Sequence, residues 1–244
     1  MSTLLQDIWE NRFVRRILLP FCGLYIVLLL IGVFFSDSLI FNPGNHSGYH
    51  DDSSIVKLIT ADGMKISAQF LPNEDAKYTI LYSHGNGEDL GEDESLLTGL
   101  HDLGFSVFAY DYHGYGTSEG KPCETTTYQD INTAYRYLTT TRHIPTENII
   151  VYGRSLGGGP SVDLASRKPV GGLILQSCFA TAFRARTQIA LLPFDKFRSI
   201  DKIGRVRCPV LIMHGKSDYV IPFHHGVQLY NAVKTPKLHF WVNA

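Results

Sequence analysis

The sequence predicts an α/β fold in which helices cover both faces of a mostly parallel sheet, with an antiparallel hairpin at the N-terminal side. Short apolar segments of strand length alternate with amphipathic helical segments along most of the chain. Two segments that alternate apolar and polar residues flank Asp62-Gly63, which indicates a hairpin. Polar signatures follow several of the apolar segments directly. In a parallel sheet these positions share one edge, where ligands bind.

The first half of this domain is expected to begin with the hairpin strands at 55–60 and 65–71. A buried strand follows at 78–83 and ends in His84-Gly85-Asn86-Gly87. Leucines at helical spacing predict a helix over 93–103, and a second apolar strand at 106–110 ends in Asp111-Tyr112-His113. Apolar residues at helical spacing then predict a helix over 128–141.

The second half repeats the alternation. β-branched and apolar runs predict strands at 149–152, 172–176, 210–214 and 238–242. Helices are expected after the first of these strands, from a small-residue stretch, and over 223–233. A basic excursion at 180–207 interrupts the pattern. The domain as a whole is expected to span residues 55–244.

Composition sets few other bounds. At 244 residues the chain is long enough for one such domain and a short appendage, and its formal net charge of -1 gives no case for a nucleic-acid partner. The cysteines are scattered, so neither a disulfide framework nor a metal site is predicted, and no cofactor is expected. They are Cys22, Cys123, Cys178 and Cys208.

The N-terminus departs from an ordinary soluble composition. Residues 17–35 are uncharged and almost wholly apolar, and at about 1.5 Å per residue they span roughly the hydrocarbon thickness of a bilayer. Three arginines precede them, whereas the next basic residue after them is Lys57. We therefore expect a cytoplasmic segment at 1–16, a transmembrane anchor at 17–35, a polar linker at 36–54, and the domain on the non-cytoplasmic side. A cleaved signal peptide and a buried core helix are the alternatives.

The segment around Ser155 carries the chemistry. An apolar strand runs into Gly153-Arg154-Ser155-Leu156-Gly157, and small residues then open a helix. This strand–turn–helix context turns the G-x-S-x-G pattern into a nucleophile-elbow hypothesis, because the turn is too tight for side chains two positions either side of the serine. A glycine-rich turn with an incidental serine is the bland alternative.

A serine nucleophile needs an acid, a base and donors for the developing oxyanion. In chain order the acid follows the serine, and Asp218, after the strand at 210–214, is the best candidate. The alternative role for Asp218 is to cap the next helix. The backbone N–H groups of Leu156 and Asn86 are the expected oxyanion donors. His84 precedes Ser155, so we interpret it as a structural residue under its loop.

These residues resemble the α/β-hydrolase superfamily, and within it the membrane-anchored single-domain members that include protein depalmitoylases. The resemblance runs from residue 55 to the end of the chain. One departure is His113, where relatives usually carry arginine. The motifs that carry the resemblance are His84-Gly85-Asn86, the segment 111–120, Gly153–Gly158, the segment 208–215, and Asp218 with Pro222.

The resemblance implies a catalytic histidine after the last strand, as Gly-His. The chain ends at Asn243-Ala244, so the expected position lies just beyond it and the triad histidine is not present in the chain. His239 lies inside the expected strand and should point to a face of the sheet. A substitute base such as His225, and a non-catalytic relative, are the other interpretations.

The resemblance also places a lid at 180–207. This segment is rich in arginine and lysine and carries an apolar patch at 189–192, so it is either a solvated face or a cap that rests on anionic lipid. The expected function is a serine hydrolase that cleaves esters or thioesters of acyl-protein or lipid substrates, with membrane lipid as a partner. The alternatives are an aminopeptidase that uses the acidic run 88–94, and an inactive membrane-tethered binding protein.

Overall fold

The computed structural model describes residues 12–44, 48–187 and 189–243. The chain divides into two compact units, and the boundary along the chain lies between Ile40 and Phe41. The first contains α2 (Arg12–Phe34) and α3 (Ser36–Ile40), and the expected cytoplasmic residues 1–11 lie outside the described part. Pro20 falls inside α2.

One helix in the described part of the chain is long and apolar enough to cross a membrane. It covers residues 15–34, with a mean hydropathy of 2.7, and only 6% of its most apolar stretch is buried. Large side chains such as Phe21 and Leu24 are two-thirds exposed. A soluble core helix would bury one face, so the low burial argues against that alternative.

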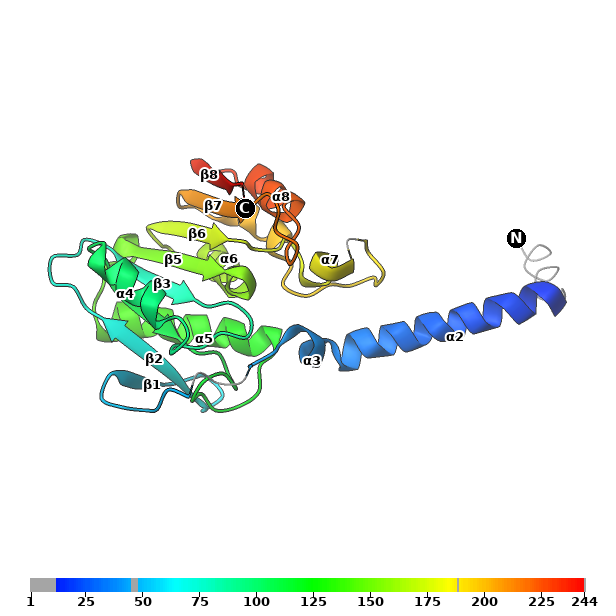
Figure 1. Ribbon diagram of the computed structural model, residues 1–244, viewed down its shortest axis with the longest axis horizontal. Helices are drawn as coiled ribbons and strands as arrows, with labels where there is room; N and C mark the ends of the chain where they lie inside the picture. The colour runs from blue at the N-terminus through cyan, green and yellow to red at the C-terminus, as the bar shows by residue number, and fades with distance from the viewer. Residues whose placement is uncertain (1–11, 45–47, 188, 244) are drawn as a thin grey trace. The chain divides into compact units, whose positions relative to one another are not determined.

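The second unit is built on one eight-stranded sheet with strand order β1-β2-β4-β3-β5-β6-β7-β8 (Figure 1). β1 and β2 form the expected hairpin and β2 pairs antiparallel with β4, while the other strands are parallel. The α/β fold class is thereby confirmed. The strands are β1 (Ile55–Ile59), β2 (Lys65–Leu71), β3 (Thr79–Ser83), β4 (Ser106–Tyr110), β5 (Ile149–Arg154), β6 (Gly172–Gln176), β7 (Val210–Gly215) and β8 (Lys237–Val242).

Helices cover both faces of the sheet centre. α4 (Glu94–Asp102) places Leu97 in a cluster with Ile80 and Tyr82 of β3. Alternate residues point to the other face, where Phe108 stacks on Tyr137 at 5.3 Å. β3 is buried along its whole length, as expected of a strand covered on both sides. The helices of the second face are α5 (Glu124–Arg136), α6 (Gly158–Arg167) and α8 (His224–Ala232).

α5 begins four residues earlier than the spacing predicts. Cys123 caps it, because the thiol accepts the Thr126 N–H while the Thr126 hydroxyl accepts the Cys123 N–H. Cysteine is not among the usual capping residues, so the prediction of a start at residue 128 was wrong. The end of the expected helix, Tyr137–Thr141, is wound as a wider π turn.

The edge at β8 is less covered. Trp241 faces α8 and packs edge-on against Phe223 at 5.1 Å. The residues that alternate with it, Leu238 and Phe240, are 72% and 61% exposed. In the described part of the chain, α4 is the helix on this face and it packs against β2 and β4. The apolar face of β8 is therefore open.

Candidate active site

Ser155 lies at the turn between β5 and α6. Its φ of +49° is in the left-handed region, which non-glycine residues rarely adopt. A Cβ on Gly157 would meet the Ser83 carbonyl oxygen at 2.0 Å, and one on Gly153 would meet the Gly157 oxygen at 2.5 Å. Only glycine fits at either position. The backbone here has the strained strand–turn–helix form that raises a serine over the end of a strand.

The start of the helical segment after Ser155 and the loop after β3 both lie at this turn. Leu156 belongs to the first turn of the helical segment after β5, where N–H groups have no acceptor within the helix. Residues 84–88, which we name the β3 loop, follow the strand that pairs with β5, with Ser83 opposite Gly153. The Asn86 Oδ1 accepts hydrogen bonds from the Tyr115 hydroxyl at 2.6 Å and the Asn42 N–H at 2.9 Å.

His84 is the first residue of the β3 loop, and its side chain is buried. Its Nδ1 lies 2.8 Å from the Gly85 carbonyl oxygen, its ring packs 4.2 Å from the Tyr112 ring, and the Tyr112 hydroxyl donates to the His84 carbonyl oxygen. Burial lowers the pKa of His84 to about 4. A neutral, fully buried imidazole with these partners has the surroundings of a structural residue.

Asp111, at the end of β4, forms a second buried polar centre. Its carboxylate accepts hydrogen bonds from the Tyr49 hydroxyl and from the Leu90 N–H. Burial raises the pKa of Asp111 to about 7. The sequence motif around Asp111 predicted a polar residue at the sheet edge, but Tyr49 lies 62 residues away and no local pattern links the two.

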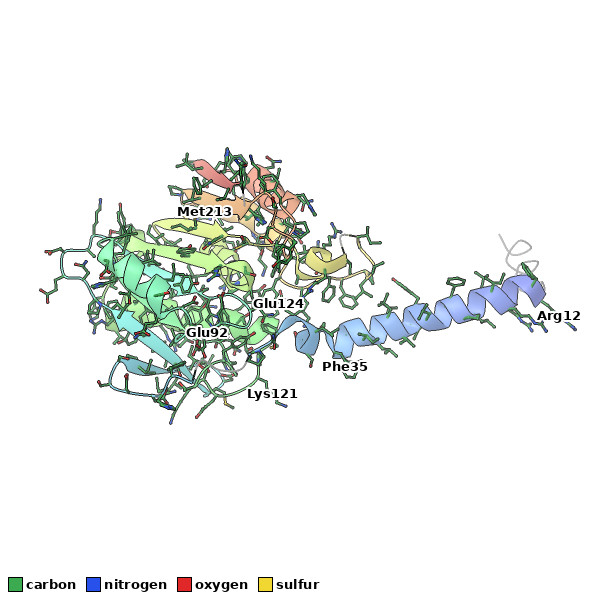
Figure 2. All side chains as sticks on the ribbon, in the orientation of Figure 1. Arg12, Phe35, Glu92, Lys121, Glu124 and Met213 are labelled. Atoms are coloured by element: carbon green, nitrogen blue, oxygen red, sulfur yellow. The ribbon has the colours of Figure 1, made fainter. Side chains whose placement is uncertain are left out.

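The acidic run 88–94 is turned toward Arg154, the residue before the candidate nucleophile. The Arg154 guanidinium lies 3.2 Å from Glu88 and 3.5 Å from Asp93. Burial raises the pKa of Asp93 to about 7, with the charge of Glu88 as the next cause. Sequence inspection did not identify this pairing. Glu92 of the same run, labelled in Figure 2, is exposed.

Asp218 follows β7, at the same edge of the sheet as Ser155 but with β6 between their strands. Its Oδ1 accepts the N–H groups of Val220 and Ile221, at 2.9 and 2.8 Å. Its Oδ2 lies 3.6 Å from Nε2 of buried His214. Phe223 precedes α8 and no side chain caps this helix, so the helix-capping role for Asp218 is excluded.

The described histidines that could act as the base have other partners. His225 Nδ1 accepts the Ala180 N–H at 3.2 Å, and burial lowers the pKa of His225 to about 4. The His239 ring stacks on Trp241 at 4.7 Å, on the α8 side of the sheet. Within the described residues, no histidine forms a hydrogen bond with the Ser155 hydroxyl. Among the described residues, no histidine therefore bridges Ser155 and Asp218 through hydrogen bonds.

His113 has an acidic partner of its own. Its Nδ1 lies 2.6 Å from the carboxylate of buried Asp130, and its Nε2 lies 3.3 Å from Asp62. Burial alone would lower the pKa of His113, but the hydrogen bond to Asp130 and the two carboxylate charges outweigh it, so this pKa is raised. A protonated His113 can thus neutralise Asp130, as an arginine at this position would.

The segment predicted as a lid contains α7 (Ala182–Thr187) and turns that return to the domain. The Asp195 carboxylate accepts the N–H groups of Phe183 and Lys196, which closes the segment into a loop. Ile189 and Leu191 at its far end are 62% and 42% exposed. Among the described residues, no cluster of side chains suits a metal ion.

Comparisons with known proteins show the family to which the chain belongs. A family model described as "Serine aminopeptidase, S33" matches residues 74–200, about half of the chain. The chain is 42% identical over 187 residues to human alpha/beta hydrolase domain-containing protein 17B, covering 75% of this chain and 65% of the human protein. It is 45% identical over 175 residues to alpha/beta hydrolase domain-containing protein aho-3 of Caenorhabditis elegans, covering 70% and 52%. The chain thus spans about half to two-thirds of these relatives.

Solved structures support the fold. An esterase from Pyrococcus furiosus superposes with a TM-score of 0.70 at 17% identity, covering 84% of this chain and 90% of the esterase. An esterase from Exiguobacterium antarcticum superposes with a TM-score of 0.59 at 18% identity, covering 76% and 90%.

Proposed function

Because the chain belongs to the serine aminopeptidase S33 family of the α/β-hydrolase superfamily, we propose that it is a membrane-anchored serine hydrolase of carboxylic esters or thioesters. One observation carries the proposal: Ser155 has a left-handed backbone between two glycines that no larger residue could replace. A strained serine at the end of a central strand costs stability, which is typical of a functional site.

In the proposed mechanism the Ser155 oxygen attacks the substrate carbonyl carbon while an imidazole takes the hydroxyl proton. The carbonyl oxygen becomes an oxyanion, which the N–H groups of Leu156 and Asn86 stabilise. The imidazolium then protonates the leaving alcohol or thiol, and the acyl group stays on Ser155. Water attacks this acyl-enzyme while the imidazole takes a water proton, and the imidazole then returns a proton to Ser155 as the carboxylic acid leaves. Asp218 orients the imidazole and stabilises its charge.

We place that imidazole outside the residues that the structure describes. The support is the partners of the described histidines: His225 accepts a backbone N–H, and His239 stacks on Trp241 on the α8 side of the sheet. The preferred location is after β8, where the resemblance to α/β-hydrolases places the catalytic histidine. Recruitment of His225 as a substitute base remains the competing assignment.

Esters are favoured over amino-terminal peptides as substrates because of Arg154. An aminopeptidase needs uncompensated carboxylates to hold the substrate ammonium group, but Glu88 and Asp93 face the Arg154 guanidinium. The description of the matching family model supports the aminopeptidase as a second candidate. The names of the structural neighbours, which are esterases, support the first.

We further propose that α2 anchors the enzyme, with its arginine-flanked N-terminal end in the cytoplasm and the hydrolase domain on the other side. The exposed Ile189 and Leu191 suit contact with the membrane surface and entry of an acyl chain. A reporter fused after residue 244 should be protected from protease in vesicles with a cytoplasmic exterior. Cleavage of the reporter would overturn the topology.

Substrate class can be tested with imidazole added to replace the missing base. The full chain in detergent micelles should hydrolyse p-nitrophenyl butyrate and butyryl thiocholine, but not alanine p-nitroanilide. Ser155→Ala supplies the background, because free imidazole itself cleaves activated esters. Preference for the anilide would establish the aminopeptidase. No rate above the Ser155→Ala background with any of these substrates would favour the binding protein.

A further inference from the structure

Residues 41–44, which we name the strap, directly follow the N-terminal unit and pack into the hydrolase domain. Phe41 is only 5% exposed, and its ring meets the Phe197 ring edge-on at 5.9 Å. The sequence predicted a linker here because of the polar residues and Pro43-Gly44. An exposed linker has no reason to bury its first aromatic side chain, so the strap is held in place.

The strap contacts the β3 loop through a hydrogen bond. The Asn42 N–H donates to the Asn86 Oδ1 at 2.9 Å, and the Tyr115 hydroxyl donates to the same oxygen at 2.6 Å. An amide oxygen has two lone pairs, so these donors use both. One donor comes from the strap and the other from the loop after β4. The Asn86 side chain is thereby fixed from two sides.

The same two segments also touch backbone to backbone. Gly44 has a φ of +70°, and a Cβ on it would lie 3.1 Å from the Gly87 carbonyl oxygen. A Cβ on Gly87 would in turn lie 3.5 Å from the Asn42 carbonyl oxygen. The close approach therefore falls at the residue that follows Asn86, and it leaves little room for the β3 loop to move toward the strap.

Through Phe41 the strap also reaches the helix that follows Ser155. A Cβ on Gly159, in the first turn of α6, would lie 2.4 Å from the Phe197 ring. Phe197 thus separates Phe41 from the start of α6. The Phe197 ring also lies edge-on to the Tyr128 ring at 5.8 Å, so packing restrains it from a second side. The strap is connected to both parts of the candidate oxyanion site, the β3 loop and the elbow helix.

We propose that the strap positions the β3 loop, with Phe41 seating it on Phe197 and the Asn42 N–H fixing Asn86 for oxyanion stabilisation. Phe41 and Asn42 are positioning residues, since neither is assigned a contact with substrate. The assignment of the Asn86 N–H as an oxyanion donor rests on the proposed function. The mechanical claim, that the strap restrains residues 84–88, does not.

Hydrogen exchange of the full chain in detergent micelles tests the restraint without any catalysis. Pulsed labelling should show amides of the β3 loop exchanging about tenfold faster in Phe41→Ala than in the unmodified chain, while amides of β5 change by less than twofold. Phe41→Leu, which keeps most of the apolar contact, should restore most of the protection. An unchanged β3 loop, or equal acceleration in β5, would overturn the proposal.

A pair of glycine variants gives a matched control. Gly44→Ala and Gly48→Ala both place a side chain on a left-handed residue, at φ of +70° and +80°, but nothing lies within 4 Å of a Cβ on Gly48. Only Gly44→Ala presses on Gly87, so it should accelerate exchange in the β3 loop several-fold, and Gly48→Ala by less than twofold. Equal effects of the two variants would contradict the contact.

Kinetics separate this proposal from the proposed function. With imidazole supplied and p-nitrophenyl butyrate as substrate, Phe41→Ala should lower kcat about tenfold and change KM less than twofold, because the oxyanion forms only during reaction. Phe41→Leu should recover kcat. An unchanged kcat in an active chain would overturn the positioning role. If the exchange results hold but the unmodified chain hydrolyses no ester, the proposed function fails while the strap's restraint stands.

Discussion

The centre and the β8 edge of the sheet are built differently, although one continuous ladder joins them. At the centre, β3 is buried throughout, and a Cβ on Gly157 would meet Ser83 at 2.0 Å. At the edge, Leu238 and Phe240 are mostly exposed. The centre carries the proposed nucleophile and the proposed oxyanion donors in tight backbone geometry. The edge carries Asp218, the proposed acid, next to an uncovered apolar face.

This difference teaches that the two halves of the candidate triad depend on different parts of the chain. All residues proposed for the Ser155 half lie within the described part of the chain, and the strap contacts one of them, Asn86. On the Asp218 side, the carboxylate accepts hydrogen bonds from its own turn, and His214 Nε2 lies 3.6 Å away. Met213 of β7, labelled in Figure 2, pairs with Phe240 in the ladder and packs against the core cluster that α4 covers, whereas Phe240 on the same face is exposed.

The largest effect is expected at the centre. Gly157→Ala should lower the free energy of unfolding by about 3 kcal/mol, because its Cβ would overlap the Ser83 carbonyl oxygen, which belongs to a buried strand. Gly99→Ala is the control, since nothing lies within 4 Å of a Cβ there and alanine favours the helix by about 0.5–1 kcal/mol. Denaturant unfolding of both variants should give opposite signs. Equal stabilities would remove the claim that the elbow is sterically fixed.

A pH effect of intermediate size is expected beside the elbow. Burial raises the pKa of Asp93 to about 7 in the folded protein, above its usual value near 4. The folded state therefore binds this proton more tightly, and the resulting stability is full below about pH 4 and is lost as pH rises through about 7.

Asp93→Asn should flatten this decline by on the order of 2 kcal/mol, allowing for screening at the partly exposed Arg154. Unfolding free energies of both proteins between pH 4 and pH 8 measure it. Asp111 shifts in the same direction, so some decline should persist in the variant. A decline of the same size in both proteins would contradict the assignment.

The smallest effects are expected at β8, where the two faces should respond differently. Trp241→Ala should cost about 1.5 kcal/mol, because the indole packs on Phe223 and His239. Phe240→Ala should cost less than about 0.5 kcal/mol and should reduce self-association, because its side chain is 61% exposed. Thermal unfolding and light scattering provide the two measurements. A larger cost for Phe240→Ala would show that its face is covered.

The parts of the molecule that could be predicted from the sequence are those that depend on residues close together in the chain. β5 is a run of apolar residues that ends in a glycine–serine turn, and the hairpin before it alternates around Asp62-Gly63. The start of α5 was missed because a thiol performs the capping. The contacts of Arg154 with Asp93 and of Asn42 with Asn86 were missed because they join segments that are 61 and 44 residues apart, for which a single sequence carries no periodic signal.

The central proposal is that Ser155 is the nucleophile, that Asp218 and the N–H groups of Leu156 and Asn86 serve as its acid and oxyanion donors, and that the base is not among the described histidines. Hydrolysis of p-nitrophenyl butyrate by the full chain, with and without added imidazole, tests it most directly.

Without imidazole the rate should be about 10⁶-fold below that of a complete triad. With imidazole it should rise at least about tenfold above Ser155→Ala under the same conditions, and Asp218→Asn should lose most of the gain. A high rate without imidazole that both Ser155→Ala and His225→Ala abolish would contradict the account, because it would make His225 the base.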